Sequence, residues 1–179
     1  MTYSLQNIDS FKSEQHIDNR GCFVNIFREG NDIDFKMHNI LQVNLSSNSQ
    51  KGTVRGLHFQ KSKFAEFKKV FCLSGSIFDV IVDVRRDSPN FLRYKEFLLS
   101  SKGFDSVIIP KGFAHGFQTL EDNTQVLYLH TNVYNKENEF GINAQDPTLS
   151  ISWPLEFTNI SDRDLRLPMS KDMKFDADF

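Results

Sequence analysis

Two histidines, His58 and His115, lie in the two sequence motifs that say most about the chemistry of this chain. The imidazole side chain suits proton abstraction because its unperturbed pKa lies near neutrality. Tyr128 would supply an acid, and Asp164 a carboxylate that orients the base. With Arg55 as a cation for an anionic ligand, these groups form a set that can move a proton on a carbon next to a carbonyl.

Lys68 and Tyr128 each allow a structural and a chemical interpretation. Lys68 and Lys69 stand just before an apolar strand, where both can be solvated, or where one ammonium group faces a developing oxyanion. Tyr128 is either a core aromatic with its hydroxyl at the rim or a general acid pointing into a cavity. The sequence leaves these alternatives open.

Asp162 and Asp164 flank Arg163 in a short acidic motif. Two carboxylates around an arginine usually form a surface cap or an ion-paired turn. Alternatively, Asp164 reaches His58, orients its ring and stabilises the imidazolium that forms when the base takes a proton. The two residues are far apart in the sequence, so spacing alone cannot decide between these interpretations.

A metal site is not expected. His115 ends a P-x-G-x-x-H spacing that often holds a metal ligand in jelly-roll proteins of the cupin type. Such a site would need a second histidine two residues beyond His58, where the chain has Gln60, and the nearest glutamate is Glu66 on a charged stretch. Two histidines without a third ligand make a poor zinc or iron site, so we expect neither metal nor cofactor.

Short runs that alternate apolar and polar residues dominate the chain, and turn signals separate them. The expected strands are Leu41–Ser46, Val70–Leu73, Ser76–Val84, Glu96–Ser100, Ser106–Ile109 and Thr124–Thr131, with an edge strand over Ile17–Phe27. Short helical turns are expected near Ser161–Leu165 and Ser170–Lys174, in an otherwise irregular C-terminal part. The pattern predicts an all-β fold, best described as a double-sheet jelly roll.

Length and composition narrow the class of protein. A chain of 179 residues predicts a single domain over 1–179, and its 18 Phe suit a barrel interior or an apolar subunit interface. A net charge of −2 without a long Lys/Arg run argues against nucleic-acid binding. No signal segment or membrane-spanning stretch is recognisable, which predicts a cytoplasmic protein. Cys72 lies in an apolar run and is expected to be a small buried hydrophobe.

Taken together, the motifs resemble those of the dTDP-4-dehydrorhamnose 3,5-epimerase family of sugar-nucleotide epimerases. The resemblance extends from about Asp18 to Pro168. Its blocks are Asp18–Gly21, Gln42–Asn44, Val54–Gln60, Ser74–Val80, Ile109–Phe117, Val126–Tyr128, Asp146-Pro147 with Trp153-Pro154, and Ser161–Asp164. The resemblance implies a cupin-type jelly roll that works as a homodimer, without metal, on a nucleotide-diphospho-sugar.

The resemblance also implies roles for individual residues. His58 matches the base, Asp164 its carboxylate partner, Tyr128 the acid on the opposite face of the sugar, and Lys68 the lysine beside the keto oxygen. Substrate-contacting positions are matched by Arg55, His115, Gln42 and Asn44, and the aromatic that stacks on the nucleotide base by Tyr134. An exchanged N-terminal arm would carry Phe23, Asn25 and Arg20, with Arg20 as a cation for the partner subunit's diphosphate.

The activity expected from the resemblance is inversion of C3, C5 or both in a 4-keto-6-deoxy sugar, in a pathway that supplies deoxysugars for surface polysaccharide or another glycoconjugate. Asn25 stands where the family commonly has a glutamate that binds the thymine ring N–H. A neutral amide offers an acceptor and two donors, which suggests a CDP or GDP carrier in place of dTDP.

Two other functions remain compatible with the residues. A ketoisomerase of the same fold would move the carbonyl between C4 and C3, with a base that serves both carbons on one face. A non-catalytic nucleotide-sugar binding module would keep His58 only for hydrogen bonding. The simultaneous presence of His58, Asp164, Lys68 and Tyr128 argues against the binding module, because binding alone does not need all of them.

Overall fold

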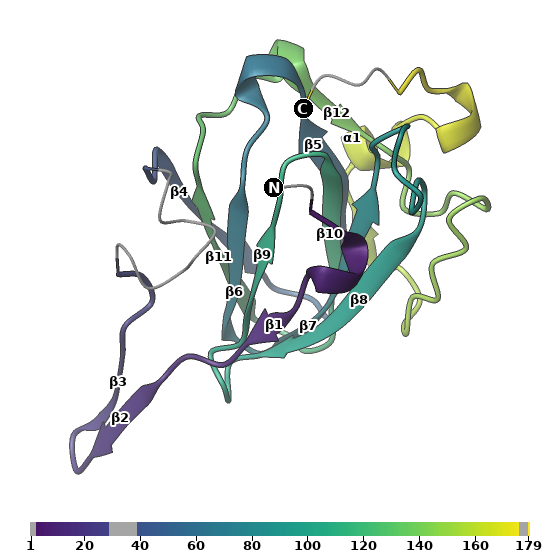
Figure 1. Cartoon of the computed structure of the whole chain (residues 1–179). Coiled ribbons are helices and arrows are strands. Elements are labelled where there is room, and N and C mark those ends of the chain that lie inside the picture. Colours follow the sequence, from purple (N-terminus) through teal and green to yellow (C-terminus); the bar gives the residue numbers. More distant parts are fainter. Residues whose placement is uncertain (1–2, 29–38, 176–178) are drawn as a thin grey trace.

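Two β-sheets lie face to face in the computed structural model, which describes residues 3–28, 39–175 and 179 (Figure 1). The first sheet has the order β1-β9-β6-β11-β4 and consists of β1 (Ser10–Phe11), β9 (Ser106–Ile109), β6 (Lys68–Ser74), β11 (Thr124–His130) and β4 (Gln42–Asn48). The second has the order β12-β5-β10-β7-β8 and consists of β12 (Glu139–Gly141), β5 (Thr53–Gln60), β10 (Phe113–Thr119), β7 (Ser76–Asp83) and β8 (Tyr94–Ser100), with β13 (Asn159–Ile160) alongside β5. The double-sheet, all-β prediction is confirmed.

The remaining elements are short. A hairpin is formed by β2 (Gln15–Asp18) and β3 (Gly21–Val24), and the one α-helix of the described residues is α1 (Asp162–Leu165). Single 3-10 turns are η1 (Leu5–Asn7), η2 (Ser62–Phe64), η3 (Lys136–Asn138) and η4 (Ser170–Asp172). The helical turns expected in the C-terminal part are therefore found at α1 and η4. Among the described residues, no helix has the length and apolar character needed to cross a membrane.

The apolar core lies between the sheets, where inward side chains of both interdigitate. Val70, Cys72 and Val126 from the first sheet pack against Ile81 and Phe117 from the second, and all are almost fully buried. Burial also raises the pKa of the Cys72 thiol to about 12, so it behaves as a small apolar side chain. The expectation that Cys72 is a small buried hydrophobe is confirmed.

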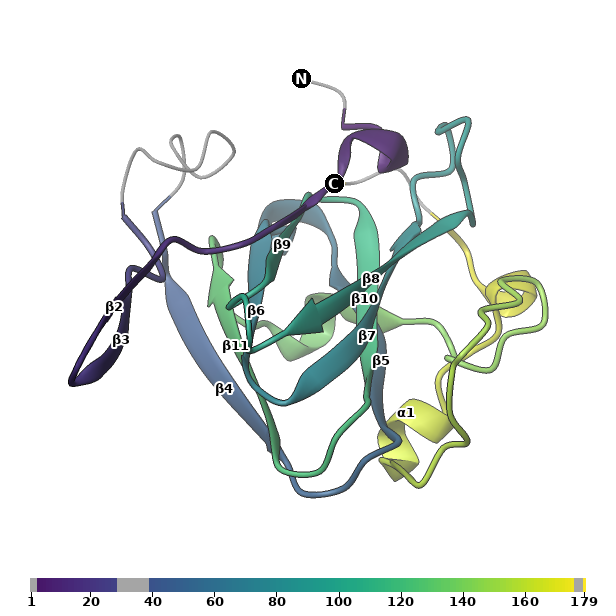
Figure 2. The same cartoon turned by 90° about the horizontal axis from the view of Figure 1, so that it is seen from below.

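Strand β4 has its apolar side chains on the outside. Val43 and Leu45 are more than half exposed, whereas Gln42, Asn44 and Ser46 border a cavity between the sheets. Figure 2, turned by 90°, shows β4 and β11 on one side of the sandwich and β5, β7 and β10 on the other. One end of the sandwich is therefore filled by apolar side chains, and the space beside β4 is lined by polar ones.

Strands β5 and β10 approach closely at two glycines. A Cβ on Gly116 would lie 2.6 Å from the carbonyl oxygen of Arg55, and a Cβ on Gly56 would lie 2.6 Å from Gly116 Cα. Gly56 also has φ +112°, in the region that favours glycine. The register shifts just after His115, which lies directly opposite His58. The two glycines thus allow the strands to bring both histidines to one place.

The N-terminal segment differs from the expected single edge strand over Ile17–Phe27, so that prediction is wrong. The chain reverses at Asn19-Arg20, and the two halves pair with each other, not with a sheet. The Asp18 carboxylate accepts a hydrogen bond from the Arg20 backbone N–H over 2.8 Å, which stabilises the turn. Figure 1 shows the hairpin extending away from the sandwich. The turn was not recognised from the sequence because polar residues occur both in the turn and in the strands on either side of it.

We predict that Gly116→Ala destabilises the fold by about 1–3 kcal/mol, because the added methyl group meets backbone that cannot move aside. The melting temperature should fall by about 2–4 °C for each kcal/mol. Gly21→Ala is the control, since its Cβ would meet nothing within 4 Å and only the strain of its positive φ remains. Equal destabilisation by the two substitutions, measured by calorimetry, would contradict the steric explanation.

Candidate functional site

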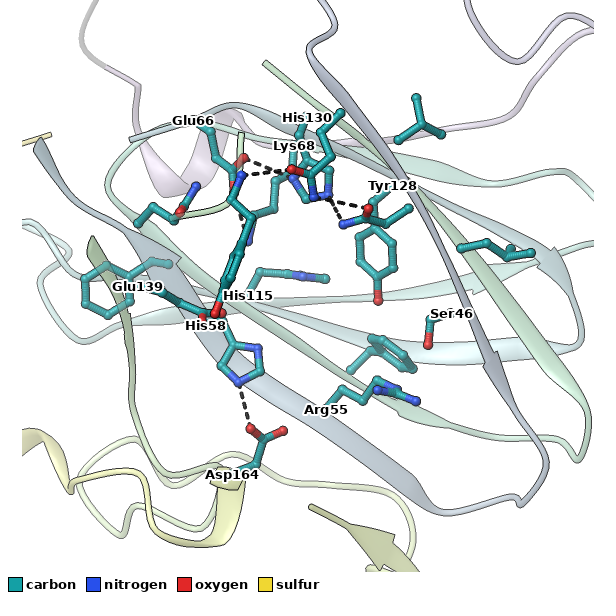
Figure 3. A pocket seen from close by; sticks show the side chains of 18 of the residues that line it. Ser46, Arg55, His58, Glu66, Lys68, His115, Tyr128, His130, Glu139 and Asp164 are labelled. Carbon is teal, nitrogen blue, oxygen red and sulfur yellow. Dashed lines mark hydrogen bonds and ion pairs between the residues drawn. The ribbon is translucent and has the colours of Figure 1, made fainter. Parts of the chain in front are cut away.

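A cavity of about 580 Å³ opens between the sheets, beside β4, β11, β5 and β10. This volume is in the range of small-molecule sites. Its lining includes nine of the residues selected from the sequence: His58, Tyr128, Lys68, Asp164, Gln42, Asn44, Arg55, His115 and Tyr134. Figure 3 shows several of these side chains converging from different strands. Fold topology thus assembles residues that are widely spaced in the sequence.

Asp164 connects the C-terminal segment to β5. Its Oδ1 lies 2.8 Å from Nε2 of His58, and its Oδ2 accepts a hydrogen bond from the Gly56 backbone N–H over 3.1 Å. Ser161 caps α1, since its Oγ accepts from the Asp164 backbone N–H, and this turn directs the buried carboxylate inwards. Of the two interpretations of the acidic motif, the structure shows the second, because Asp164 is the partner of His58. The cap is made by Ser161, and Arg163 pairs with Glu139 outside the motif.

The environment of Asp164 favours its ionised form. Burial acts to raise the pKa of this carboxyl, but the hydrogen bond and charge of His58, the Gly56 amide and the charge of Arg163 outweigh burial and hold the pKa below its usual value. The carboxylate therefore accepts a hydrogen bond from Nε2–H of His58, and Nδ1 is left to face the cavity (Figure 3). A histidine held in this way can take a proton at Nδ1 while Asp164 stabilises the resulting imidazolium.

Tyr128 comes from β11, in the opposite sheet. Its ring lies 6.3 Å from that of His115 and 5.9 Å from that of His130, so neighbouring rings fix its position. Burial, followed by the charge of Asp79, raises the pKa of the Tyr128 phenol, and Arg55 and a hydrogen bond to Ser46 oppose this only partly. Tyr128 therefore keeps its proton at neutral pH and can act as a proton donor in the cavity.

His115 forms a second buried pair, with a residue that the sequence did not single out. Its Nε2 lies 2.7 Å from Oδ2 of Asp79, which is fully buried on β7. Asp79 was detectable as a charged residue inside an otherwise apolar strand, Ser76–Asp83. Because a buried charge must be paired, this position indicated a polar partner in the opposite strand. His58 and His115 are thus each oriented by an aspartate.

Lys68 has two neighbours that were also missed. Its Nζ lies 3.5 Å from Oε1 of Glu66, and Oε2 of Glu66 lies 3.0 Å from Nδ1 of His130. From the sequence, Glu66 was weighed only as a metal ligand, and no role was assigned to His130. The alternation of β11 placed His130 toward the cavity, but no sequence signal connected it with Glu66.

Polar side chains also surround the mouth of the cavity. Arg55 donates from Nε to Oδ1 of Asn48 over 2.7 Å. Tyr134 is half exposed, and its backbone N–H donates to Oε1 of Gln42 over 2.8 Å. An arginine and an aromatic ring at the mouth are suited to an anionic ligand with a flat end.

Three expected binding residues lie elsewhere in the single chain. Arg20, Phe23 and Asn25 are on or just after the β2–β3 hairpin, are exposed, and do not line the cavity. Arg20 instead makes an ion pair with Asp18 over 2.6 Å, at the hairpin turn. The described ranges contain no cluster of three or more His, Cys, Asp or Glu side chains that could hold a metal ion.

We predict that Asp164→Asn lowers the free energy of unfolding by about 2 kcal/mol at pH 7, because a charge-assisted hydrogen bond is lost. Since the folded-state pKa of Asp164 is depressed, the carboxylate stabilises the fold above about pH 4, and this contribution is lost as the pH falls through the folded-state value. Urea unfolding should show the difference narrowing below about pH 4. Asp162→Asn, on the exposed side of α1, is the control, and a pH-independent difference for Asp164 would contradict the assignment.

Known proteins similar to this chain are found both by sequence and by structure. The family model described as dTDP-4-dehydrorhamnose 3,5-epimerase matches residues 2–172. The curated enzyme of that name from Mycobacterium tuberculosis is 40% identical over 164 residues, which cover 89% of this chain and 81% of the relative. The one from Escherichia coli is 38% identical over 144 residues, which cover 76% and 75%.

Solved structures agree with this assignment. The dTDP-4-dehydrorhamnose 3,5-epimerase from Bacillus anthracis, with TDP and PPi bound, has a TM-score of 0.86 at 34% identity and covers 94% of this chain and 97% of its own. The Legionella pneumophila enzyme in complex with dTDP-4-keto-L-rhamnose has a TM-score of 0.85 at 34% identity, with coverages of 93% and 89%. Sequence and structure together show that this chain belongs to the dTDP-4-dehydrorhamnose 3,5-epimerase family.

Proposed function

We propose that this protein inverts C3, C5 or both in a nucleotide-linked 4-keto-6-deoxy sugar. The observation that supports this most strongly is the position of His58 and Tyr128, which reach one cavity from opposite sheets. A base on one face of a sugar ring and an acid on the other are what a net inversion needs. A single group that served both faces would mostly return the starting configuration.

In this mechanism the 4-keto group acidifies the hydrogens on C3 and C5. His58 removes one of them through Nδ1, and the C–H electron pair moves into the enolate, whose negative charge develops on the keto oxygen. The ammonium group of Lys68 stabilises that oxygen. Tyr128 then donates its phenolic proton to the carbon from the opposite face, the carbonyl re-forms, and the centre is inverted. Exchange with water restores the protonation of His58 and Tyr128.

Each of these roles has a physical support in the chain. Asp164 stabilises the imidazolium that His58 becomes after abstraction, because its buried carboxylate already accepts from Nε2–H. The raised pKa of Tyr128 keeps the phenol protonated until the enolate, a stronger base, forms beside it. Lys68 lines the same cavity with its ammonium beside the Glu66 carboxylate.

Substrate binding is assigned to the mouth of the cavity. Arg55 and His115 are placed to contact the sugar and its phosphate, and the exposed ring of Tyr134 to stack on the nucleotide base. The Bacillus anthracis relative holds TDP, and the Legionella pneumophila relative a dTDP-sugar, which supports dTDP as the carrier. Asn25 still favours CDP or GDP on hydrogen-bonding grounds, so all three carriers belong in the assay.

We further propose a homodimer in which the hairpins are exchanged. Ile17 and Phe23 on the hairpin are 76% and 69% exposed, and Val43 and Leu45 on the edge strand β4 add further exposed apolar surface. Figures 1 and 2 place the hairpin and β4 on the same side of the molecule. Such surface is typical of an interface. An exchanged hairpin would bring Arg20 to the partner's diphosphate.

We predict opposite defects for the two proton-carrying residues in D2O. His58→Asn should reduce deuterium incorporation into the 4-keto sugar by about 10³-fold or more, because abstraction fails. Tyr128→Phe should retain exchange at the abstracted position but lose the inverted product by about 10²-fold, because reprotonation occurs only from the face of His58. Mass spectrometry reports the label, and NMR reports its position and the configuration, with the sugar carried on dTDP, CDP or GDP.

Several outcomes would overturn these assignments. Label at neither C3 nor C5 with any of the three carriers would reject the epimerase in favour of a binding module. A product with its carbonyl at C3 would identify a ketoisomerase. Equal loss of exchange in both variants would place His58 and Tyr128 on the same step. Nucleotide affinity, measured by calorimetry, serves as the control that each variant retains a formed site.

We predict that Ile17→Glu dissociates the dimer and lowers kcat/KM by about tenfold or more, although Ile17 lies outside the cavity, because a buried charge at an interface is costly. Leu98→Glu is the matched control, since Leu98 is 70% exposed on β8 of the other sheet. Sedimentation velocity over a range of concentrations measures the assembly. A monomeric wild type, or full activity of a monomeric Ile17→Glu variant, would contradict the exchanged hairpin.

A further inference from the structure

A series of hydrogen bonds that ends in an ion pair connects the mouth of the cavity with Lys68. It begins at the Tyr134 backbone N–H, which donates to Gln42 Oε1 over 2.8 Å, and Gln42 Nε2 then donates to Asn44 Oδ1 over 3.1 Å. Asn44 Nδ2 lies 3.3 Å from Nε2 of His130. Nδ1 of His130 lies 3.0 Å from Glu66, whose other oxygen lies 3.5 Å from Lys68 Nζ. We call this series the Tyr134–Lys68 relay; Figure 3 shows its Lys68, Glu66 and His130 end.

The direction of every bond in the relay is fixed from its first member. A backbone N–H can only donate, so the side-chain atom of Gln42 that faces Tyr134 must be the carbonyl oxygen. The amide nitrogen of Gln42 therefore faces Asn44, and the Asn44 atom that receives its hydrogen bond must be an oxygen. The Asn44 amide nitrogen consequently points to His130, where it can only donate.

The same reasoning fixes the tautomer of His130. Because Asn44 donates to it, Nε2 of His130 must carry a lone pair and no proton. The ring proton then sits on Nδ1, where the Glu66 carboxylate accepts it, and that carboxylate independently requires a donor at this position. The Glu66 end requires a proton on Nδ1 and the Asn44 end requires none on Nε2, and the neutral Nδ1–H form meets both requirements. Agreement between two independent constraints is the reason to assign the relay a function.

We propose that His130 is a positioning residue, which holds Lys68 through Glu66 and couples its position to the nucleotide end of the cavity at Tyr134. The proposal rests on the proposed roles of Lys68 at the keto oxygen and Tyr134 at the base. The Glu66 side chain is 6% exposed and that of His130 is 10% exposed, so water competes little for these bonds. Glu66 thus receives one hydrogen from His130 on one oxygen and attracts the ammonium group on the other.

Protonation of His130 would break the relay in a defined way. An Nε2–H would confront the Asn44 amide N–H₂, and reversal of Asn44 and then of Gln42 would only move the conflict to the fixed Tyr134 N–H. The groups that face His130 are Lys68 and Glu66 beside β6, the stacked phenol of Tyr128 on its own strand, and the neutral amides of β4. Across the cavity, His115 on β10 faces Tyr128. Positive charge on His130 would therefore add to that of Lys68 at a single carboxylate.

The first test reads the tautomer of His130 directly. Long-range ¹H–¹⁵N NMR correlation of the protein labelled with ¹⁵N-histidine distinguishes Nδ1–H from Nε2–H, and the spectrum of His130→Asn assigns the signal. We expect the Nδ1–H form at the pH of maximal turnover. An Nε2–H form, or an imidazolium at that pH, would overturn the relay. This readout does not depend on the substrate, so it decides the relay even if the proposed activity proves wrong.

The second test uses turnover. His130→Phe keeps an aromatic ring but removes both ring nitrogens, and Glu66→Gln removes the charge beside Lys68. Each variant should lower kcat about tenfold with little change in KM, and the double variant should lower it by no more than either alone, because all three break one unit.

The controls separate positioning from general damage. Gln125→Asn lies on the same strand but does not line the cavity, and it should leave kcat unchanged. Independent effects that multiply to about a hundredfold in the double variant would reject the relay. Loss of dTDP affinity in parallel with kcat would instead indicate a collapsed site, and would also reject positioning of Lys68 as the cause. If the wild type never exchanges deuterium, the proposed function fails and the tautomer measurement stands alone.

Discussion

The carboxylate of Asp164 is the contact on which the site depends. Its two oxygens are engaged by the His58 ring and the Gly56 backbone, and its own backbone N–H is capped by Ser161. A buried carboxylate is stable only when it is paired and hydrogen-bonded, so this set of partners is also the condition for its burial. The same contacts fasten the C-terminal segment to β5. Burial of one charge therefore orients His58 and at the same time holds the C-terminal segment against β5.

Two kinds of pattern made most of the fold predictable from the sequence. β4, β8 and β11 are partly exposed and were recognised from alternation, whereas β6, β7 and β9 are buried almost throughout and were recognised as β-rich apolar runs between turn signals. β10 is equally buried but was not expected, because His115, Gly116 and Gln118 interrupt its apolar residues. The N-terminal hairpin was missed because its turn residues are as polar as its strands. Local pattern therefore predicts a strand that alternates or forms an apolar run, and misses a strand that does neither.

The site could be predicted only in part, for a related reason. His58, Lys68, Tyr128 and Asp164 were selected by chemical type and by resemblance, and the fold brings all of them to one cavity. The partners Asp79 and Glu66 were missed because each acts across strands, and sequence separation hides such contacts. Arg20, Phe23 and Asn25 cannot be placed at a site within one chain, since the hairpin leads them away from it. In the proposed homodimer, their roles would depend on a second subunit.

The polar end of the sandwich shows how buried charges tune one another. Asp79 pairs with His115 and also helps to raise the pKa of Tyr128, although no direct bond joins it to the phenol. Glu66 is shared by a lysine and a histidine in the same way. In a region of low effective dielectric such influences extend beyond contact distance. The protonation states of the cavity therefore belong to the group as a whole.

The two faces of strand β4 have different surroundings. Its inner face carries Gln42 and Asn44 beside the cavity, and its outer face carries exposed Val43 and Leu45 at an edge of the sheet. A displacement of this strand from outside would move the inner amides with it, because successive side chains share one backbone. A subunit packed on the outer face, as in the proposed homodimer, would thus also hold the inner amides in place.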